Sequence, residues 1–495
     1  MKGFPGVLLV LFPSLLLAVE EARNIRIVSD RCPDFYSTKT MVQSVTKGLK
    51  TDREKVIAIY DLMRSMVYHW QYPAEKGRHV GTLKLLNVYG WTLCGGQASC
   101  LITMYQDLGY ETHYRGWSSP GHTTMEVKYG GKWHWVDTFL KLIPFKPNGE
   151  IAGQEEIKAD PSIVLRLQYD SSRQICWYPE DMPRDDWDAA RWRRAHPMLL
   201  CRDSKEGCVQ GCRNSRVTGW GGTGTRDRDG YKTDVDLRPG MSLKLRWEAD
   251  PGGWYTARNR KPGHSCGTRD FRNDPIIGPK LEPYGRRTWA NGDLVFEPDL
   301  SKGRAVGFDR ASGGVYVVTM KSPFVVAHAD VQAEGRGEVK IDVQSRFGKR
   351  EGLSPGQLPD EIVRGVYQYV LTVRCRKLTK LRVHSLIQHN RCTRPFLLPG
   401  KNVWTVSVDR APRRGKVTVE VAYKPRFHTK SLKARWKSGE SLYTNKHVKE
   451  APRPVVKSVT LKGNKGRIEF DVPSDNTDDP AYPRMLYILY RVDPR

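Results

Sequence analysis

Beyond its first 19 residues, the 495-residue sequence has no apolar run that approaches the roughly 18 residues of a membrane-spanning helix. We therefore expect no membrane span in the mature chain. Residues 1–19 carry one lysine and a short apolar stretch with two prolines, a pattern typical of a cleaved secretory signal peptide. An uncleaved anchor is the alternative, but the stretch is short for a bilayer. We expect cleavage near Ala18 and a secreted or otherwise extracytoplasmic protein.

The sequence also lacks an internal repeat at a fixed period and a convincing metal motif. Its densest cysteine cluster, three residues between 201 and 212, has only His196 at useful spacing, which argues against zinc. The acids Asp227 and Asp229 are better explained by a solvated loop than by calcium binding. We therefore expect no cofactor and no metal.

Ten cysteines in an exported chain favour disulfides. We expect them mainly within the cluster at 201–212 and at Cys375 and Cys392, which flank a stretch interpreted as a β-hairpin. If Cys94 remains a thiol, nine cysteines are left, so at least one other is also unpaired.

Acidic residues are scarce between residues 371 and 450. This stretch holds 20 lysines and arginines against four acids, in a chain whose formal net charge is +27. Such an imbalance predicts a basic surface that attracts polyanions. Because export makes nucleic acid an unlikely partner, we expect an acidic glycan. A solvated, positively charged surface without a dedicated ligand is the alternative.

Two helices are predicted in the first third of the chain. Thr51 and Glu54 form a capping box, and the apolar residues that follow recur at three- and four-residue intervals, which predicts a helix over 52–69. A second helix follows the stretch YGWTLCGGQAS and ends near Gly109. Cys94 therefore lies at or just before a helix N-terminus.

A β-hairpin is predicted around the turn Gly130-Gly131. A two-residue turn pairs Tyr129 with Lys132, and the same register places residue 124 opposite Asp137. His122 then lies on the same face as Asp137, with Cβ atoms about 7 Å or less apart. His134 lies on the opposite face and is interpreted as a packing residue.

These positions suit a cysteine nucleophile. A helix N-terminus stabilises a thiolate, and the nucleophile then requires a base and an orienting carboxylate, which His122 and Asp137 can supply. The alternative for Cys94 is a disulfide with Cys100. Six residues of helix turn the two side chains through about 600° and separate them along the axis, so that pairing requires a broken helix.

Residues 89–139 resemble the core of the transglutaminase-like superfamily. The matching elements are C-G-x-x-A from Cys94, LGYETHYRGW after the helix, H-x-x-x-E-V from His122, and W-x-x-V-D-T from Trp133. There are departures. Thr124 replaces an aromatic residue found in many members, and Gly95 stands where animal transglutaminases have tryptophan. A calcium-regulated crosslinker is therefore not supported.

The resemblance implies a papain-like transglutaminase core domain. Together with the strand pattern later in the chain, we expect an α+β fold in which this core precedes one or two antiparallel β-sandwich domains. The resemblance also implies a triad of Cys94, His122 and Asp137 that performs acyl transfer or hydrolysis at an amide of a protein or peptide. The backbone N–H of Cys94 would stabilise the oxyanion. The family often adds an upstream indole, for which Trp70 and Trp91 are the candidates.

Alternating apolar residues between turn signals predict many short strands beyond residue 280. By contrast, residues 176–279 are rich in arginine, aspartate, glycine and tryptophan, with weak periodicity. The expected divisions are a signal peptide at 1–19, a catalytic domain at 20–175, an irregular connection at 176–279, a β-sandwich at 280–425 and a further β-rich region at 426–495.

The composition also allows a second interpretation of the protein's function. More than half of the chain is expected to be β-rich and cationic, and LLPGKNVWTVSVD (397–409) faintly resembles the turn and strand of jelly-roll sugar-binding domains. The alternative to an enzyme is therefore an extracellular binding or adhesion protein whose transglutaminase-like domain is only a scaffold.

Overall fold

The structure is a computed structural model. It describes residues 21–69, 72–75, 78–118, 121–140, 142–165, 202–218, 230–250, 253–255, 288–301, 306–430, 448–473 and 481–494. The expected signal peptide, Trp70, Cys201 and the acid pair at 227 and 229 lie outside these residues. Among the described residues, no helix is both long and apolar enough to cross a membrane.

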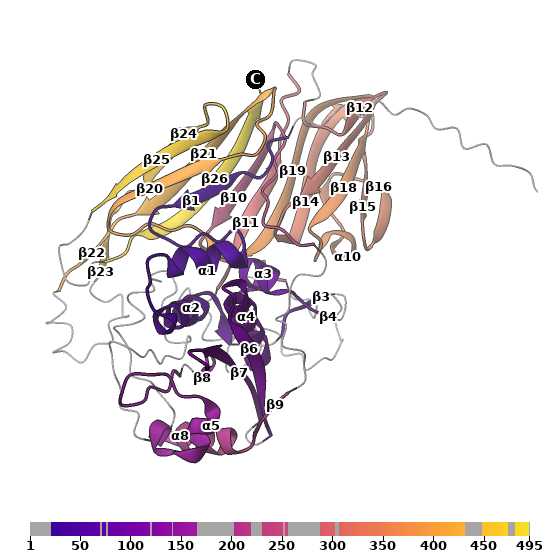
Figure 1. Cartoon of the computed structure of the whole chain (residues 1–495). Helices are drawn as coiled ribbons and strands as arrows, with labels where there is room; N and C mark the ends of the chain where they lie inside the picture. The colour runs from indigo at the N-terminus through magenta and orange to yellow at the C-terminus, as the bar shows by residue number, and fades with distance from the viewer. Residues whose placement is uncertain are drawn as a thin grey trace, which may run out of the picture.

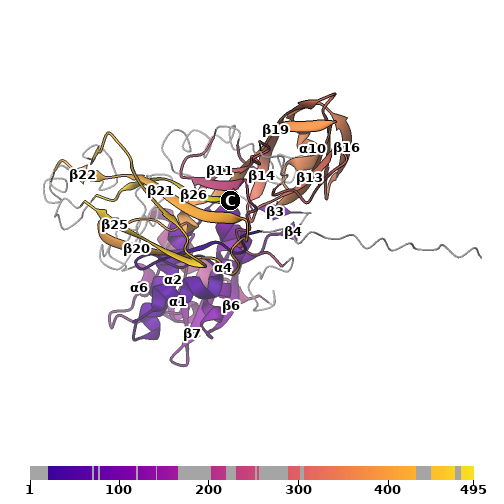
Figure 2. The ribbon, with the colours of Figure 1, turned by 90° about the horizontal axis from the view of Figure 1, so that it is seen from above.

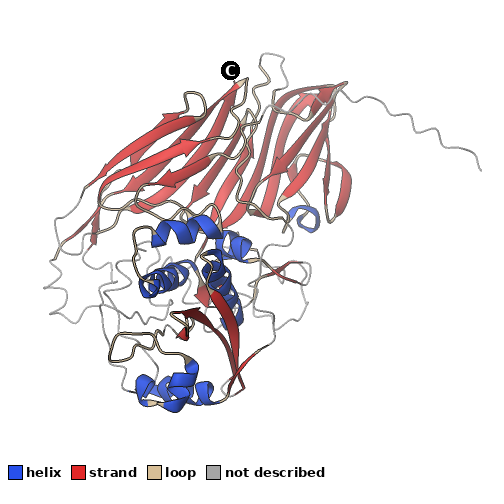
Figure 3. Cartoon of the chain, viewed as in Figure 1, coloured by secondary structure: helices blue, strands red, loops and turns tan. Residues whose placement is uncertain are grey.

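The chain is β-rich and is built from several antiparallel sheets (Figure 3). Most of its helices and one four-stranded sheet form an N-terminal module. It lies against one end of a larger assembly of sheets, which we call the β module (Figure 1). The expectation of helices early in the chain and antiparallel sheets later is confirmed at this level.

Three helices form the centre of the N-terminal module: α1 (Thr38–Thr46), α2 (Asp52–Met66) and α4 (Cys94–Asp107). The capping box of α2 is present, since Thr51 accepts from the Glu54 N–H and Glu54 accepts from the Thr51 N–H. The helix ends at Met66, three residues earlier than expected. All three helices bury apolar side chains in one hydrophobic core. Short helical turns α3 (Thr82–Lys84) and η1 (Leu85–Tyr89) lead towards α4.

The four-stranded sheet of this module has the order β8-β7-β6-β9. Its strands are β6 (Glu111–Ser118), β7 (Gly121–Tyr129), β8 (Lys132–Val136) and β9 (Ser215–Val217). Tyr129 pairs with Lys132, so the predicted register is confirmed. Gly130 and Gly131 both have positive φ angles, 55° and 75°, as a two-residue type I′ turn requires.

The stretch expected to be an irregular connection contains regular elements. Helix α8 (Arg202–Arg213) packs on α5 (Gln154–Ala159) and α6 (Ser162–Leu165), and β9 adds a strand to the four-stranded sheet. Strand β10 (Met241–Arg246) belongs to the β module. These elements escaped prediction because arginine and glycine interrupt the apolar pattern around them and because their buried residues pack on segments distant in the sequence.

An antiparallel sheet of eight strands extends across the β module (Figures 1 and 2). Its order is β17 (Gly356–Gln357), β14 (Val325–Arg336), β19 (Lys377–Asn390), β11 (Trp289–Phe296), β10, β26 (Arg484–Pro494), β21 (Gly415–Lys424) and β24 (Val455–Thr460).

Two smaller sheets pack on this large sheet. The five-stranded sheet contains β12 (Arg310–Ser312), β13 (Val315–Lys321), β18 (Gln368–Arg374), β15 (Lys340–Ser345) and β16 (Gly348–Leu353), with the short helix α10 (Asp360–Val363) nearby. The three-stranded sheet contains β1 (Arg26–Ser29), β20 (Gly400–Ser407) and β25 (Lys465–Val472).

Side-chain contacts join the layers. The Tyr369 hydroxyl of β18 lies 2.8 Å from the Ser385 hydroxyl of β19, and the Tyr423 ring of β21 lies 6.1 Å from that of Phe470 in β25. Strand β1 comes from the start of the chain, yet it pairs with β20. The first described strand therefore belongs to the β module rather than to the domain expected at 20–175.

The expected hairpin between Cys375 and Cys392 is wrong. Residues 377–390 form the single strand β19, whose 14 residues span about 45 Å at ~3.3 Å each. Cys375 and Cys392 therefore lie at opposite ends of one strand, far beyond disulfide reach. No disulfide joins any of the described cysteines, and Cys208 and Cys212 are buried thiols on α8.

Candidate active site

Cys94 is the first residue of α4, and its side chain is half-buried. The residue before it, Leu93, supplies no side-chain cap to the helix. The first backbone N–H groups of α4, beside Cys94, have no acceptor within the helix, as at any helix N-terminus. Their partial positive charge favours a thiolate at this position.

His122 and Asp137 are in direct contact. The His122 Nε2 atom lies 2.7 Å from Asp137 Oδ2, and both side chains are buried. Asp137 directly follows β8, and its Oδ1 atom accepts the Leu140 N–H at 2.7 Å. The carboxylate is thus held by the backbone on one side and orients the imidazole on the other.

His122 also forms a hydrogen bond with Cys94. A hydrogen bond joins the side chains of His122 and Cys94, and because Nε2 is used by Asp137, Nδ1 is the atom that faces the thiol. Burial by itself lowers the pKa of His122, but the negative charge of Asp137 and the hydrogen bonds to Asp137 and Cys94 raise that pKa to about 10. His122 is therefore an imidazolium at neutral pH, next to Cys94.

Aromatic rings enclose His122. The ring centroid of Trp117 lies 4.9 Å away in an edge-on arrangement, and that of Phe139 lies 5.3 Å away. The Trp117 indole N–H donates to Gln154 Oε1 at 2.9 Å, which fixes its orientation. Gly211 of α8 also packs on Trp117, so closely that a Cβ there would lie 2.0 Å from the indole.

Of the two tryptophan candidates for the oxyanion site, the structure describes Trp91 but not Trp70. Trp91 is 1 % exposed and packs edge-on against Tyr89 at 5.3 Å, so it is a core residue. Trp70 lies outside the described residues. The expected packing role of His134 is confirmed: it is buried, with Nδ1 2.6 Å from the Ile151 carbonyl and Nε2 3.1 Å from the Tyr129 carbonyl.

Tyr72 is a residue of this site that the sequence did not indicate. Its hydroxyl oxygen accepts hydrogen bonds from the backbone N–H groups of Gly95 and Gly96, and a Cβ at Gly95 would lie 2.5 Å from that oxygen. Burial and the nearby Cys94 raise the pKa of the Tyr72 phenol. No spacing signal links residues 72 and 94, so only the folded chain reveals the contact.

On the same face of β7 as His122, Glu126 connects several elements. Its Oε1 atom accepts the Gln154 N–H at the start of α5 at 2.6 Å, and its Oε2 atom lies 2.7 Å from His113 Nε2 and 3.5 Å from Arg115 Nε. Glu126 is 2 % exposed and is the acid of the H-x-x-x-E stretch. These bonds hold β7, the strand that carries His122.

Side chains of the β module donate hydrogen bonds to the end of α2 and to the segment that leads to Cys94. Asn390, at the end of β19, donates to the carbonyls of Met66 and Leu86 at 2.8 and 2.6 Å, and Thr288 donates to the Gly90 carbonyl at 2.7 Å. Gly90 has a φ of 73°, and a Cβ there would lie 2.6 Å from Thr288. Glycine is therefore required where the β module meets this turn.

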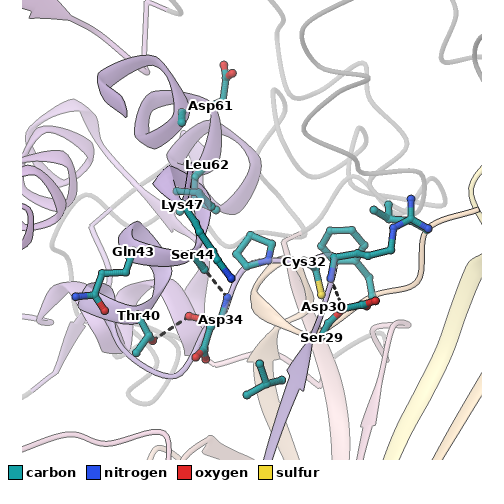
Figure 4. Close-up of a pocket in the computed structure, with 17 residues that line it drawn as sticks. Ser29, Asp30, Cys32, Asp34, Thr40, Gln43, Ser44, Lys47, Asp61 and Leu62 are labelled. Atoms are coloured by element: carbon teal, nitrogen blue, oxygen red, sulfur yellow. Dashed lines mark hydrogen bonds between the residues drawn. The ribbon is translucent and has the colours of Figure 1, made fainter. Parts of the chain in front are cut away.

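A separate cavity of about 610 Å³ lies between the two modules (Figure 4). It is lined by the end of β1, the following loop with Asp30 and Cys32, parts of α1 and α2, and Phe396 and Leu398. Cys94, His122 and Asp137 do not line it. Burial raises the pKa of the Cys32 thiol to about 11, so this cysteine is a poor nucleophile at neutral pH.

Within the described part of the chain, no group of three or more His, Cys, Asp or Glu side chains is arranged to hold a metal ion. No known protein-family model matches the chain, and no curated protein matches its sequence.

Proposed function

We propose that this protein is a transglutaminase-like cysteine enzyme with a papain-like core, and that it performs acyl transfer or hydrolysis at amide bonds. The observation that supports the proposal is a chain of hydrogen bonds among three side chains. Cys94 is hydrogen-bonded to His122, and His122 Nε2 lies 2.7 Å from Asp137 Oδ2. A nucleophile, a base and an orienting acid in hydrogen-bond contact constitute the arrangement that this chemistry requires.

In the proposed reaction, the Cys94 thiolate attacks the carbonyl carbon of a carboxamide or peptide. A carbon–sulfur bond forms and the carbonyl π electrons move to oxygen, whose charge the Cys94 N–H stabilises. The tetrahedral intermediate collapses, the carbon–nitrogen bond breaks, and the His122 imidazolium protonates the departing amine. Water or a second amine then attacks the thioester carbonyl while neutral His122 accepts its proton. The carbon–sulfur bond breaks, the acid or new amide is released, and Cys94 leaves as the thiolate beside the His122 imidazolium. Asp137 keeps the imidazole oriented throughout.

Acylation by an activated ester tests this proposal. Purified protein is incubated with p-nitrophenyl acetate and each cysteine is examined for an acetyl group by peptide mass spectrometry. We expect acetylation at Cys94 in the wild type, none at this position in Cys94→Ala, and much slower acetylation in His122→Gln. Equal acetylation of Cys94 with and without His122 would refute an activated nucleophile.

We propose glycan binding as a second function, because the β module gathers basic residues at one end. Ser385 of β19 and Val419 of β21 lie in one row of paired residues across β11, β10 and β26. The starts of β19 and β21 therefore lie at the same end of the sheet. Exposed Lys377, Lys380 and Lys416 are located there, opposite the end of β19 that contacts the N-terminal module. Part of the basic stretch, 431–447, lies outside the described residues.

Chromatography on heparin, as a model acidic glycan, tests this second function. We expect retention that weakens steeply with salt, because surface charge attraction is screened. Lys377→Glu with Lys416→Glu should elute at lower salt than the wild type. The matched control, Lys39→Glu with Lys55→Glu, changes the same charge on the helices of the other module and should elute at higher salt than the β-module variant. Equal elution of both variants would exclude a specific basic end.

A further inference from the structure

The pairing of β14 with β19 ends in two residues of like charge. Further along the two strands, Lys380 pairs with Glu334, and the Lys380 Nζ atom lies 3.0 Å from Glu334 Oε1. The last pair is Arg336 opposite Lys377, and both residues are exposed. Opposite residues of an antiparallel pair project from the same face with Cβ atoms about 5 Å apart, and like charges at that distance repel each other. The repulsion reduces stability, so this pair requires an explanation other than folding.

Arg376 adds a third exposed cation at the same place, since its N–H donates to the Arg336 carbonyl at 3.0 Å. We call Arg336, Arg376 and Lys377 the β14/β19 corner. Acids of the adjacent segments are paired with other bases: Glu334 with Lys380 at 3.0 Å, Glu338 with Lys340 at 2.6 Å, and Asp342 with Arg374 at 2.8 Å. Within the described part of the chain, none of the three corner cations has an acidic partner.

Close backbone packing holds the corner together. A Cβ at Gly335 would lie 2.7 Å from the Lys377 carbonyl oxygen and 3.1 Å from Cys375 Sγ, so glycine is required there. A Cβ at Gly337, whose φ is 78°, would lie 3.7 Å from Arg376 Cβ. The segments that follow β14 and β18 therefore lie against each other, and the backbone brings the three cations together before any ligand binds. Such preorganisation reduces the entropy that binding costs.

We propose that the β14/β19 corner binds a sulfate group of an acidic glycan. This inference rests on the proposed glycan binding and names the group that the basic end of the β module recognises. Guanidinium groups donate to oxyanions through a planar fork, and an ammonium group supplies three further donors. A sulfate group presents three terminal oxygens, one for each cation, whereas a carboxylate presents two. Bound sulfate also offsets the repulsion between Arg336 and Lys377.

Binding of the full chain to heparin and to hyaluronan tests this inference, because hyaluronan carries carboxylates and no sulfate. Both glycans are measured at the same low ionic strength. Arg336→Gln with Lys377→Gln should weaken heparin binding by about tenfold or more. The same variant should change hyaluronan binding by less than about threefold.

A matched control removes one arginine and one lysine from elsewhere in the β module. Arg350→Gln with Lys349→Gln changes two exposed residues of β16 that have acidic partners, Glu361 and Glu351. Heparin binding by this control should weaken by less than about threefold. Thermal unfolding without glycan supplies a second readout: the corner variant should melt at the same temperature as the wild type or higher, since it removes a like-charge pair.

The outcomes separate this inference from the proposed function. If the wild type binds neither glycan, glycan binding itself fails. If the corner variant and the control lose heparin affinity equally, the corner is not a specific site and the inference is wrong, although glycan binding stands. Equal losses by the corner variant on both glycans also overturn it, because the corner then does not distinguish sulfate from carboxylate. A lower melting temperature of the corner variant would mean that the two cations are bonded within the chain, which contradicts the inference.

Discussion

At the scale of the residue, His122 is the group whose charge state links stability to pH. Its pKa is about 10 in the folded chain and about 6.5 when exposed. Between these values the folded protein binds a proton that the unfolded chain has released. Stability from this group is therefore fully present below about pH 6.5 and is lost as pH rises through about 10.

This linkage predicts a pH-dependent difference between Cys94→Ala and the double variant Cys94→Ala with His122→Gln. Cys94 is removed from both proteins because a folded-state thiolate releases a proton that would offset the one His122 binds. The difference in the free energy of unfolding should be largest near pH 6 and should shrink progressively towards pH 10. Urea unfolding at several pH values measures it. A difference that is constant over this range would mean that His122 is not held as an imidazolium.

At the scale of the element, α8 supports the site from behind. Gly211→Ala places a Cβ about 2 Å from Trp117, whose ring packs on His122. We expect a loss of about 1–3 kcal/mol in the free energy of unfolding and slower alkylation of Cys94, because the indole must shift. Gly207→Ala is a matched control in the same helix, since a Cβ there has nothing within 4 Å. It should stabilise the helix by up to about 1 kcal/mol. If both variants showed the same free energy of unfolding and the same Cys94 alkylation rate, the proposed support of the site by α8 would be contradicted.

The elements that could be predicted from sequence are those defined by local signals. The capping box at Thr51 and the Gly130-Gly131 turn specify a helix start and a hairpin register from a few adjacent residues. Strand β19 was not predicted, because a β-bulge at Thr379, where Glu334 pairs with Lys380 and Gly335 with Leu378, interrupts the apolar alternation at its start. Tyr72 was not predicted either, since its partners at Gly95 and Gly96 are determined by tertiary folding.

At the scale of the whole molecule, the β module and the N-terminal module are joined through buried polar contacts. Asn390 is completely buried and bonds to carbonyls of α2 and of the turn before Cys94. Strand β1 passes from the start of the chain into the β module. Such long-range pairings leave no local pattern, which explains why the expected domain boundaries miss them. The two modules are therefore expected to unfold together.

Asn390→Ala tests this coupling. It removes a donor from the buried carbonyls of Met66 and Leu86, of which Leu86 keeps a longer bond from the Thr393 hydroxyl at 3.3 Å. We therefore expect a loss of about 1–3 kcal/mol in the free energy of unfolding and slower alkylation of Cys94 in the folded protein. Asn402→Ala removes an equally buried amide that bonds to the carbonyls of Leu398 and Gly400, inside the β module. It should reduce stability without changing Cys94 reactivity. Loss of reactivity in Asn402→Ala alone would contradict the coupling.

The central claim is that Cys94 is an activated nucleophile, and its alkylation rate measures this most directly. The purified protein is treated with iodoacetamide without reductant over a range of pH, and labelled cysteines are mapped by mass spectrometry in the wild type and in His122→Gln. The account predicts rapid labelling of Cys94 at mildly acidic pH that is lost in the variant. Labelling no faster than that of an ordinary thiol, or Cys94 recovered in a stable disulfide, would contradict it.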